Sequence, residues 1–408
     1  MKRTLITNIG MLATPQGTAA RGGRAQGEIC ILKNAWIFIE NDVIAQVGTG
    51  AAPAAAGAQT INAGGKLVTP GLVDAHTHLI FGGWRQNELA LKLHGAGYLD
   101  ILAAGGGILS TMRATQSASE EQLEAKASAA LDEMLRFGTT TAEAKSGYGL
   151  STGEECKALR VIGNLQKHHV MDLAATFMGA HAVPEAYRDN RQGYLELLCE
   201  EMLPAVREQG IAEFCDVFCE KGVFSAEESR RILLTGRQYG LRPKIHADEI
   251  EAIGGSELAG EIGAVSAEHL IVCPPSGIAS MAEGGTVACC LPATSFYLGA
   301  AYAPVQDMVQ AGVPVAMATD FNPGSCPCLN MQLVISLGCL RYRLTPEQAL
   351  TAVTLNGAAA ICRADRIGSI EPGKQADILI WNAEDLDYIC YRLGSNLVDT
   401  VIKKGNVV

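Results

Sequence analysis

The chain has 408 residues, of which 48% are hydrophobic and 18% are charged. This composition provides for a large buried core and excludes a disordered, collagen-like or coiled-coil chain. Lys and Arg number 32 against 43 Asp and Glu, and the formal net charge of −11 argues against nucleic-acid binding, because a phosphate backbone needs a broad basic surface. A small anionic substrate stays compatible, since one or two local cations in a cleft are enough to bind it.

The cysteines and the apolar runs predict a cytoplasmic protein. The 13 cysteines are spread along the chain without the spacing of a disulfide-stapled domain. Thr7 and Asn8 interrupt the first apolar run, which is too short for a signal peptide. The longest uncharged stretch, residues 284–306, contains Pro292 and Pro304 and predicts a buried strand with a loop rather than a membrane helix. No contact with a membrane is expected.

Both ends of the chain show the pattern of short strands. Apolar and β-branched runs alternate there with turn residues, and the C-terminal runs follow a Pro-Gly turn at residues 372–373. Two such ends around a different middle predict one small β domain built from both termini. The strand-like runs cover residues 4–7, 30–32, 35–39, 43–47, 376–381 and 400–403.

The middle of the chain alternates between strand-like and amphipathic segments. Capping side chains mark helix starts at Ser119, Ser225 and Thr345. Alternation repeated about eight times is typical of a (β/α)8 barrel. The strand-like runs are residues 72–78, 139–145, 173–181, 214–220, 244–249, 265–270, 287–291 and 313–320.

A doubly wound open sheet would also alternate, but the glycine-rich phosphate motif that it needs is absent. The Gly run at residues 105–107 does not follow a strand and does not fit that motif. We therefore predict an α/β fold, namely a (β/α)8 TIM barrel at residues 66–362. A small composite β-sandwich domain, built from residues 1–65 and 363–408, completes the predicted architecture.

The strongest local signal is the His-x-His pair of His76 and His78. Residues i and i+2 of a strand point to the same face, so both imidazoles would enter the barrel interior. Two neighbouring imidazoles on a rigid strand suit one metal ion. The alternative is a pair of core histidines satisfied by hydrogen bonds.

The positions of the other histidines favour the metal site. Barrel enzymes build their active sites at the carboxyl ends of the strands. Of the 8 histidines, five fall at such predicted ends, and acidic residues occur there as well. Besides His76 and His78, the candidates are His181, His246, Glu249, His269 and Asp320.

A metal ion held by His76, His78, His246 and Asp320 would have three nitrogen ligands and one carboxylate, with room for water. Such an ion lowers the pKa of bound water and supplies hydroxide near neutral pH. The residues therefore predict metal-assisted hydrolysis of a C–N bond.

Three residues are candidates for moving protons in that reaction. Asp320 could accept the proton of the water as well as bind the metal, and His269 could orient the nucleophile or stabilise developing charge. Glu249 lies three residues after His246, where a strand gives way to a loop. It is therefore the candidate that carries the proton to the leaving nitrogen.

These residues and their surroundings resemble the amidohydrolase superfamily. The Pro-Gly-Leu-Val-Asp-Ala-His-Thr-His segment at residues 70–78, the later single His, His and Asp, and the β-rich flanks all match, as does the turn at residues 368–377. The resemblance spans nearly the whole chain. It implies a barrel metallohydrolase with a small composite β domain.

Four further segments resemble the members that open the ring of an imidazolone bearing a propionate during histidine degradation. They cover residues 143–150, 177–181, 246–249 and 319–325. This resemblance implies one divalent or trivalent ion, zinc or iron, a small anionic substrate and a homodimer. It implies metal ligation by His76, His78, His246 and Asp320, and substrate contacts from Arg85, Tyr148, His181, Glu249, Asn322, Gly324 and Ser325.

The chemistry of the substrate-contact residues agrees with these implied roles. A propionate needs a fixed cation, which Arg85 can supply from a loop. Tyr148 lies in a glycine-flanked turn that can present its hydroxyl to a carboxylate, and His181 can donate to the ring carbonyl. Asn322 and the Gly324 backbone could hold the carboxylate of the opened product. There is an alternative for each of the first two residues. Arg85 could form an ordinary surface ion pair, and Tyr148 could be an aromatic side chain that only packs in its loop.

Three alternative interpretations stay open at this point. A second metal could bind near Glu220 and Lys221, and a nucleobase deaminase or a non-catalytic scaffold would share parts of the pattern. A deaminase does not need an anion-binding pair such as Arg85 with Tyr148, and a scaffold would not need four metal ligands. The cysteine pairs at residues 215 and 219 and at 326 and 328 lack soft-metal spacing and predict buried thiols.

Overall fold

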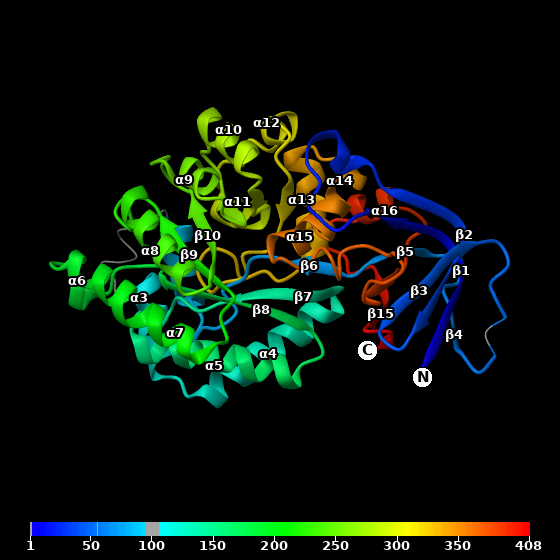
Figure 1. The fold of residues 1–408 in the computed structure, drawn as a ribbon, viewed down its shortest axis with the longest axis horizontal. Coiled ribbons are helices and arrows are strands. Elements are labelled where there is room, and N and C mark those ends of the chain that lie inside the picture. Colours follow the sequence, from blue (N-terminus) through cyan, green and yellow to red (C-terminus); the bar gives the residue numbers. More distant parts are fainter. Residues whose placement is uncertain (1, 55, 95–105) are drawn as a thin grey trace.

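The computed structural model describes residues 2–54, 56–94 and 106–408. Eight parallel strands form a nearly closed barrel in chain order, and Figure 1 shows helices such as α4, α5, α9 and α10 around its outside. The predicted (β/α)8 barrel is therefore confirmed. Its strands are β6 (Leu72–Asp74), β7 (Thr139–Lys145), β8 (Asp172–Ala180), β9 (Phe214–Cys219), β10 (Arg242–Ala247), β11 (Ser266–His269), β12 (Val287–Cys290) and β13 (Val315–Met317).

The barrel closes just beyond the ends of its first and last strands. An isolated parallel bridge joins Thr77 to Phe321. The backbone N–H of His78 donates to Phe321 O at 2.9 Å, and that of Asp320 donates to His76 O at 3.0 Å. The segments that carry three of the predicted metal ligands are thus held together by backbone hydrogen bonds.

Capping side chains start three of the helices at the predicted positions. Ser119, Ser225 and Thr345 each accept a hydrogen bond from the backbone three residues on, and each forms a complete capping box. The described α-helices are α1 (Leu89–Leu93), α3 (Ile108–Ser117), α4 (Glu120–Arg136), α5 (Thr152–His168), α6 (Arg191–Glu196), α7 (Leu203–Gln209), α8 (Ala226–Gln238), α9 (Gly255–Glu261), α10 (Pro275–Gly284), α11 (Pro292–Leu298), α12 (Val305–Gln310), α13 (Met331–Tyr342), α14 (Pro346–Ala352), α15 (Leu355–Ala360) and α16 (Leu386–Tyr391).

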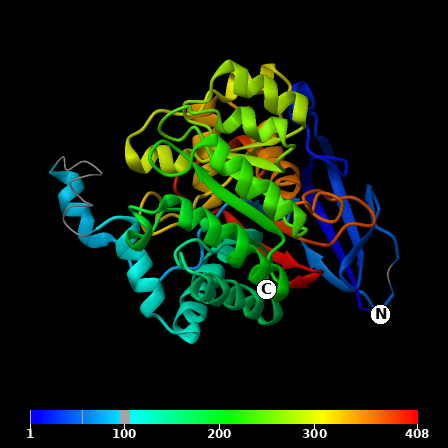
Figure 2. The ribbon, with the colours of Figure 1, turned by 60° about the vertical axis from the view of Figure 1, so that its left-hand side comes forward.

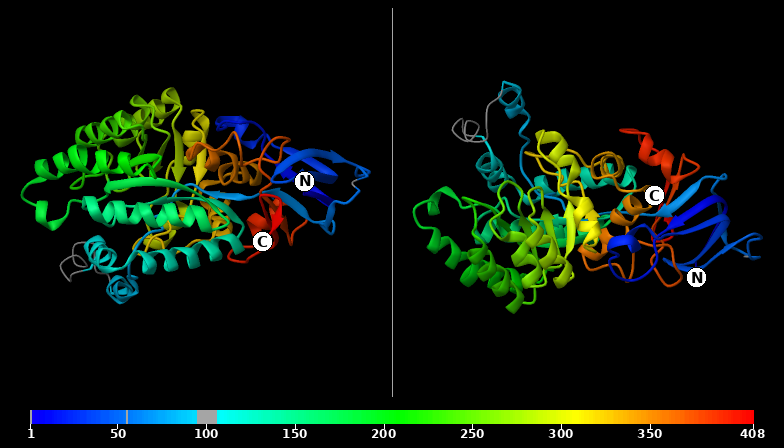
Figure 3. Two further views of the ribbon diagram at one scale, coloured as in Figure 1. Left: turned by 60° about the horizontal axis from the view of Figure 1, so that its bottom comes forward. Right: turned by 90° about the horizontal axis from the view of Figure 1, so that it is seen from above.

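A second, mixed sheet is built from both ends of the chain, and Figure 2 shows its blue N-terminal strands beside the barrel. Both termini lie at the same end of the molecule (Figure 3). The strand order is β16-β15-β14-β5-β1-β2-β3, with β4 beside β1. The bounds are β1 (Arg3–Thr14), β2 (Cys30–Glu40), β3 (Val43–Thr49), β4 (Gln59–Asn62), β5 (Leu67–Pro70), β14 (Ile378–Trp381), β15 (Val398–Lys403) and β16 (Asn406–Val407).

This sheet has an apolar core to which both termini contribute. Ile6 and Ile37 from the N-terminal strands are buried in one cluster with Ile378 and Ile402 from the C-terminal strands. Burial of these apolar side chains in one core stabilises the association of the two ends of the chain. The small β domain from both termini is confirmed, while the bounds 1–65, 66–362 and 363–408 stay a prediction.

Two predicted strand breaks are wrong. β1 continues through Asn8, where the register with β2 shifts, and β2 continues through Asn34. Both asparagines have left-handed backbone angles, with φ of 54° and 50°. Asparagine tolerates this conformation, so these residues change the local pairing without ending the strand.

The uncharged stretch at 284–306 contains β12, as predicted, but a short helix follows where a loop was expected. Pro292 occupies the first turn of α11, where a missing N–H costs nothing, so it begins a helix rather than interrupting one. Within the described residues, every helix is too short or too polar to cross a bilayer.

Candidate active site

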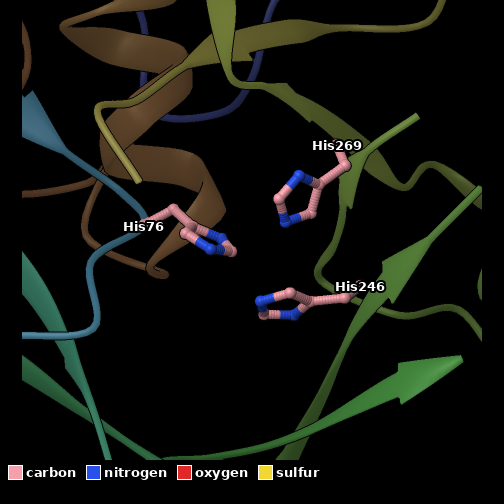
Figure 4. A group of neighbouring side chains, drawn as sticks. All are labelled: His76, His246 and His269. Carbon is pink, nitrogen blue, oxygen red and sulfur yellow. The ribbon is translucent and has the colours of Figure 1, made fainter. Parts of the chain in front are cut away.

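The predicted metal ligands meet at the carboxyl ends of the barrel strands. His246 lies on β10 and His269 ends β11, while Asp320 follows β13. His76 and His78 follow β6, which ends at Asp74, so their expected placement on the strand itself is wrong. All five side chains are nevertheless buried, and Figure 4 shows His76, His246 and His269 pointing toward one another.

The backbone turns sharply at two of these positions. His269 and Asp320 have φ of 68° and 57°, in the left-handed region that residues with a Cβ rarely adopt. This conformation costs of order 1–3 kcal/mol and persists only where the surrounding structure enforces it. At His269 it coincides with the end of β11, whereas Asp320 lies three residues after β13.

Three of the distances between the four predicted ligands are those expected around one ion. His246 Nε2 lies 3.3 Å from His78 Nε2. Asp320 Oδ1 lies 3.4 Å from His76 Nε2 and 3.5 Å from His78 Nε2. Tetrahedral coordination with bonds of about 2.0–2.1 Å places ligand atoms about 3.3–3.4 Å apart. These three distances therefore fit a shared ion, while the set of four ligands stays a prediction.

Unsatisfied polar atoms at this point also fit a cation. Among the described residues, His76 Nε2 and Asp320 Oδ1 are buried without a hydrogen-bond partner. Leaving such atoms unpaired in the interior is costly, and a cation between them would satisfy both. The described residues form two groups of possible metal ligands. His76, His78 and Asp320 make one group, His76, His246 and His269 make the other, and neither group holds all four predicted ligands.

Carboxylates and a hydroxyl fix the orientation of the candidate ligands. Glu268 Oε2 lies 2.5 Å from His76 Nδ1, and Asp216 Oδ1 lies 3.1 Å from His246 Nδ1. A carboxylate at Nδ1 leaves the Nε2 lone pair for a metal. Thr294 Oγ1 donates to Asp320 Oδ2 at 2.7 Å, which leaves Oδ1 for the same point.

Burial keeps the imidazoles in the form that binds metals. It lowers the pKa of His76, His78 and His269 well below the ordinary histidine value, and neighbouring positive groups add to the effect. A neutral imidazole has the free lone pair that a metal requires. Burial also raises the pKa of Asp320 to about 6.

Glu249 faces the same space from the loop after β10. Its Oε2 lies 3.6 Å from His269 Nε2, and its side chain keeps 16% of its exposure. Burial, with smaller contributions from the charges of Asp320 and Glu220, raises the pKa of Glu249 to about 8. A carboxyl group with such a pKa can both accept and donate a proton near neutral pH.

Glu220 and Lys221, near which a second metal could bind, have other partners in the structure. The Glu220 carboxylate accepts backbone N–H groups of Ile250 and Glu251 at 2.9 and 3.1 Å and so anchors the Glu249 loop. Lys221 points outward, with 67% of its side chain exposed, and pairs with Glu251. Neither residue belongs to a group of possible metal ligands in the described part of the chain.

The prediction of buried thiols is confirmed for three of the four cysteines, and Cys328 is only partly buried. All are free, and Cys215, Cys219 and Cys326 are buried while Cys328 is partly buried. Burial raises the pKa of all four. These thiols thus stay protonated and apolar in character.

Tyr148 lies in a loop that a buried carboxylate organises. Glu155 on α5 accepts backbone N–H groups of Gly147, Gly149 and Leu150 at 2.8–3.0 Å. Burial raises the pKa of Tyr148, so its hydroxyl stays protonated and can donate. The sequence analysis missed Glu155, which lies four residues after Ser151 in the first turns of α5.

Glu155→Ala is expected to destabilise the protein by about 3 kcal/mol, because it leaves buried N–H donors without an acceptor. Urea unfolding measures this change. Glu227→Ala is the control, since the Glu227 side chain is 88% exposed and lies 3.8 Å from Arg230 at the surface, so its loss should cost less than about 0.5 kcal/mol. Equal stabilities of the two variants would contradict the assigned role of Glu155.

His181 connects this loop to the metal ligands. Its Nδ1 lies 3.0 Å from Gly147 O, so it donates there, and its ring stacks on His78 with centroids 4.7 Å apart. The Tyr148 ring lies 5.2 Å from the His181 ring. The loop thus positions both predicted substrate contacts beside the ligand cluster.

Arg85 packs against Gly324, which lies in the loop after β13. A Cβ on Gly324 would lie 2.2 Å from an Arg85 guanidinium nitrogen, so the guanidinium packs directly on this glycine. Arg85 Nε donates to both Glu88 oxygens at 3.0 Å, and 13% of its side chain is exposed. The guanidinium is thereby held at the edge of the site.

Asn322 shapes the loop after β13. Its Oδ1 accepts the N–H groups of Gly324 and Ser325 at 2.8 and 2.7 Å, and its Nδ2 donates to Asp320 O at 2.7 Å. Asn322 is buried, whereas Ser325 is partly exposed. The metal-ligand candidates are thus buried, while Arg85, His181 and Ser325 lie toward the solvent side.

The sequence profile of the Amidohydrolase family matches residues 67–408. The chain belongs to the amidohydrolase family. The imidazolonepropionase of Alkaliphilus metalliredigens (strain QYMF) is 50% identical over 100% of this chain and 98% of its own length. The imidazolonepropionase of Bacillus cereus (strain G9842) is 49% identical over 100% of this chain and 97% of its own.

Solved structures share the fold at much lower identity. A triazine hydrolase variant matches with a TM-score of 0.76 and 17% identity over 100% of this chain and 94% of its own. Escherichia coli guanine deaminase matches with a TM-score of 0.75 and 16% identity over 100% of this chain and 99% of its own. These likenesses support the architecture of a barrel with a composite β domain.

Proposed function

We propose that this enzyme catalyses the imidazolonepropionase reaction of L-histidine degradation. It hydrolyses a cyclic amide C–N bond of 4-imidazolone-5-propanoate and yields N-formimidoyl-L-glutamate. The observation that carries the proposal is identity of about 50% over the full chain with proteins of that name. The convergence of His76, His78, His246 and Asp320 supports the hydrolytic chemistry.

We assign one metal ion, zinc or iron, to these four side chains. Imidazole and carboxylate ligands accept both metals. When bound, the ion supplies an acidified water as nucleophile and polarises the scissile carbonyl group. Glu268, Asp216 and Thr294 hold the ligands in place through the contacts described above.

We assign the proton transfers to Asp320 and Glu249 and the stabilisation of charge to His269. Asp320 takes the proton of the attacking water, because its Oδ1 lies beside the ligand nitrogens. Glu249 delivers a proton to the leaving ring nitrogen, for which its raised pKa suits it. His269, 3.6 Å from Glu249, stabilises the charge that develops on the attacked carbon's oxygen.

We assign the substrate propionate to Arg85 and Tyr148. The guanidinium offers paired donors, and the protonated phenol adds one more. We place the Nε2 of His181 against the substrate ring, where it accepts a hydrogen bond from a ring N–H, because Nδ1 already donates to Gly147 O. Asn322, Gly324 and Ser325 line the side where the carboxylate of the opened product forms.

Arg85→Ala is expected to raise KM about tenfold or more with a smaller change in kcat. A hydrogen-bonded charge contributes about 1.5–3 kcal/mol and acts equally on bound substrate and transition state. Steady-state kinetics measures both constants. Arg188→Ala, at an arginine whose side chain is 73% exposed, is the control. A normal KM in Arg85→Ala would remove Arg85 from the substrate site.

The reaction itself is tested by two parallel assays. We expect the purified enzyme to consume 4-imidazolone-5-propanoate, followed by its ultraviolet absorbance, and to release no ammonia from guanine or cytosine. The opposite result would assign a deaminase. Absence of both activities in a protein that contains the metal would favour a different cyclic amide.

We further propose a cytoplasmic homodimer. The free thiols of all 13 cysteines support a reducing compartment. Light scattering on the purified protein should give twice the chain mass of 43.0 kDa. A mass of one chain would contradict the dimer.

A further inference from the structure

Five charged side chains form a continuous chain inside the barrel, beneath the ligand cluster. Their signs alternate, and all are fully buried. They come from β11, β10, β7 and β9, so they connect opposite sides of the barrel interior. In order of contact, they are Glu268, Lys244, Glu143, Lys145 and Asp216.

The contacts along this buried charge chain are short. Lys244 Nζ lies 3.5 Å from Glu268 Oε1 and 3.1 Å from Glu143 Oε1. Lys145 Nζ lies 2.8 Å from Glu143 and 2.7 Å from Asp216 Oδ2. Each lysine therefore bridges two carboxylates, and Glu143 joins the two lysines.

The two ends of the charge chain are the carboxylates that hold the ligand histidines. Glu268 uses Oε1 toward Lys244 and Oε2 toward His76. Asp216 uses Oδ2 toward Lys145 and Oδ1 toward His246. In both cases the lysine occupies one oxygen and the imidazole the other, so the lysine determines which oxygen faces the histidine.

Hydroxyl groups and backbone carbonyls complete the charge chain. Thr176 Oγ1 donates to Glu143 at 2.5 Å, and Ser266 Oγ donates to Glu268 Oε1 at 2.5 Å. Lys244 also donates to the carbonyl groups of Ala75 and Ala360 at 3.3 and 3.2 Å. This network has little freedom to rearrange, because its donors are matched to fixed acceptors.

A barrel interior needs only apolar volume for stability, and burying ions costs several kcal/mol each. Replacement of buried ion pairs by apolar residues is often neutral or stabilising. Buried charges can hold side chains in fixed positions. Here the carboxylates at the two ends of the charge chain contact His76 and His246, which are metal-ligand candidates. This placement indicates that the five charged side chains orient the ligand histidines.

We propose that Lys145 and Lys244 are positioning residues that act through Asp216 and Glu268 to align His246 and His76 for the metal. The proposal rests on the metal centre of the proposed function. Because Glu143 connects both lysines, a change at either one should disturb both ligand histidines. The charge chain thereby determines both the affinity of the site for the metal and the arrangement of its ligands.

The test measures metal binding to the full-length protein. Wild type, Lys145→Met and Lys244→Met are stripped of metal and titrated with Co²⁺ against a competing chelator. Loss of a group that orients a ligand typically weakens metal binding by about 10–100-fold, and this is the result we expect for each variant. The visible absorption bands of bound Co²⁺ should also shift, because they report the arrangement of the ligands.

Lys403→Met is the matched control. Lys403 is 2% exposed and pairs with Asp377 and Asp172 at 2.7 and 2.8 Å, but it lies in the mixed sheet. A purely structural role of a buried lysine would lower stability in all three variants without changing Co²⁺ affinity or spectrum. We expect Lys403→Met to show this behaviour.

Wild-type Co²⁺ affinity and spectrum in folded Lys145→Met and Lys244→Met would overturn the proposal. If both variants fail to fold, Ser266→Ala replaces them, since it removes only one hydroxyl from Glu268, and an unchanged Co²⁺ spectrum there would also overturn it. A wild type that binds Co²⁺ but does not open the imidazolone ring refutes the proposed function alone. Weaker binding in the lysine variants would support the positioning role even then.

Discussion

His76→Ala is expected to lose the bound metal and to lower turnover by at least about 10³-fold. His76 belongs to both groups of candidate ligands, and its Nε2 has no hydrogen-bond partner among the described residues. Loss of metal assistance removes several kcal/mol of transition-state stabilisation, and each 1.36 kcal/mol is tenfold in rate. Elemental analysis and steady-state kinetics of the purified variant measure the two effects.

His168→Ala is the control for this variant. His168 ends α5, is exposed and lies outside the groups of possible ligands. It should keep the metal and the activity of the wild type. A His76→Ala enzyme with a full complement of metal, or with undiminished turnover, would show that the four side chains do not form the catalytic metal site.

Glu249→Gln is expected to keep the metal and to lower kcat by about 10²–10⁴-fold, the usual contribution of a positioned proton-transfer group. The amide retains the size of the side chain but cannot move a proton between water and the leaving nitrogen. Kinetics on the metal-loaded variant measures the loss. Because KM depends on Arg85 and Tyr148 in our account, it should change little.

Glu251→Gln separates the proton transfer from a general effect on the loop. Glu251 lies two residues further on, is exposed and pairs with Lys221 at 2.8 Å. It should retain kcat within about twofold, since a surface ion pair contributes at most about 1 kcal/mol to stability. Equal rates for Glu249→Gln and wild type would leave Glu249 only a packing role.

The sequence predicted the barrel correctly, and it yielded the candidate ligands, because both depend on local patterns. Capping residues and β-branched runs located the helices and strands, and the rule that barrel sites occupy strand ends selected His246 and Asp320. The placement of His76 and His78 on β6 was wrong for a tertiary reason. The chain there pairs with the segment around Phe321 rather than continuing the strand.

The supporting residues could not be predicted from local patterns. Glu155 acts on a loop several residues away, and Thr294 reaches Asp320 from α11. Lys145 and Lys244 occupy predicted strands, where a lysine usually points to solvent. Their burial follows only from closing the barrel, which places their partners from other strands within hydrogen-bond distance.

The most direct test of the central claim is anomalous diffraction from crystals of the purified enzyme, recorded at the absorption edge of the metal found by elemental analysis. We predict one peak per chain, at about 2.0–2.2 Å from Nε2 of His76, His78 and His246 and from Asp320 Oδ1. A peak elsewhere, or none in crystals of enzyme that still turns over the substrate, would contradict this account.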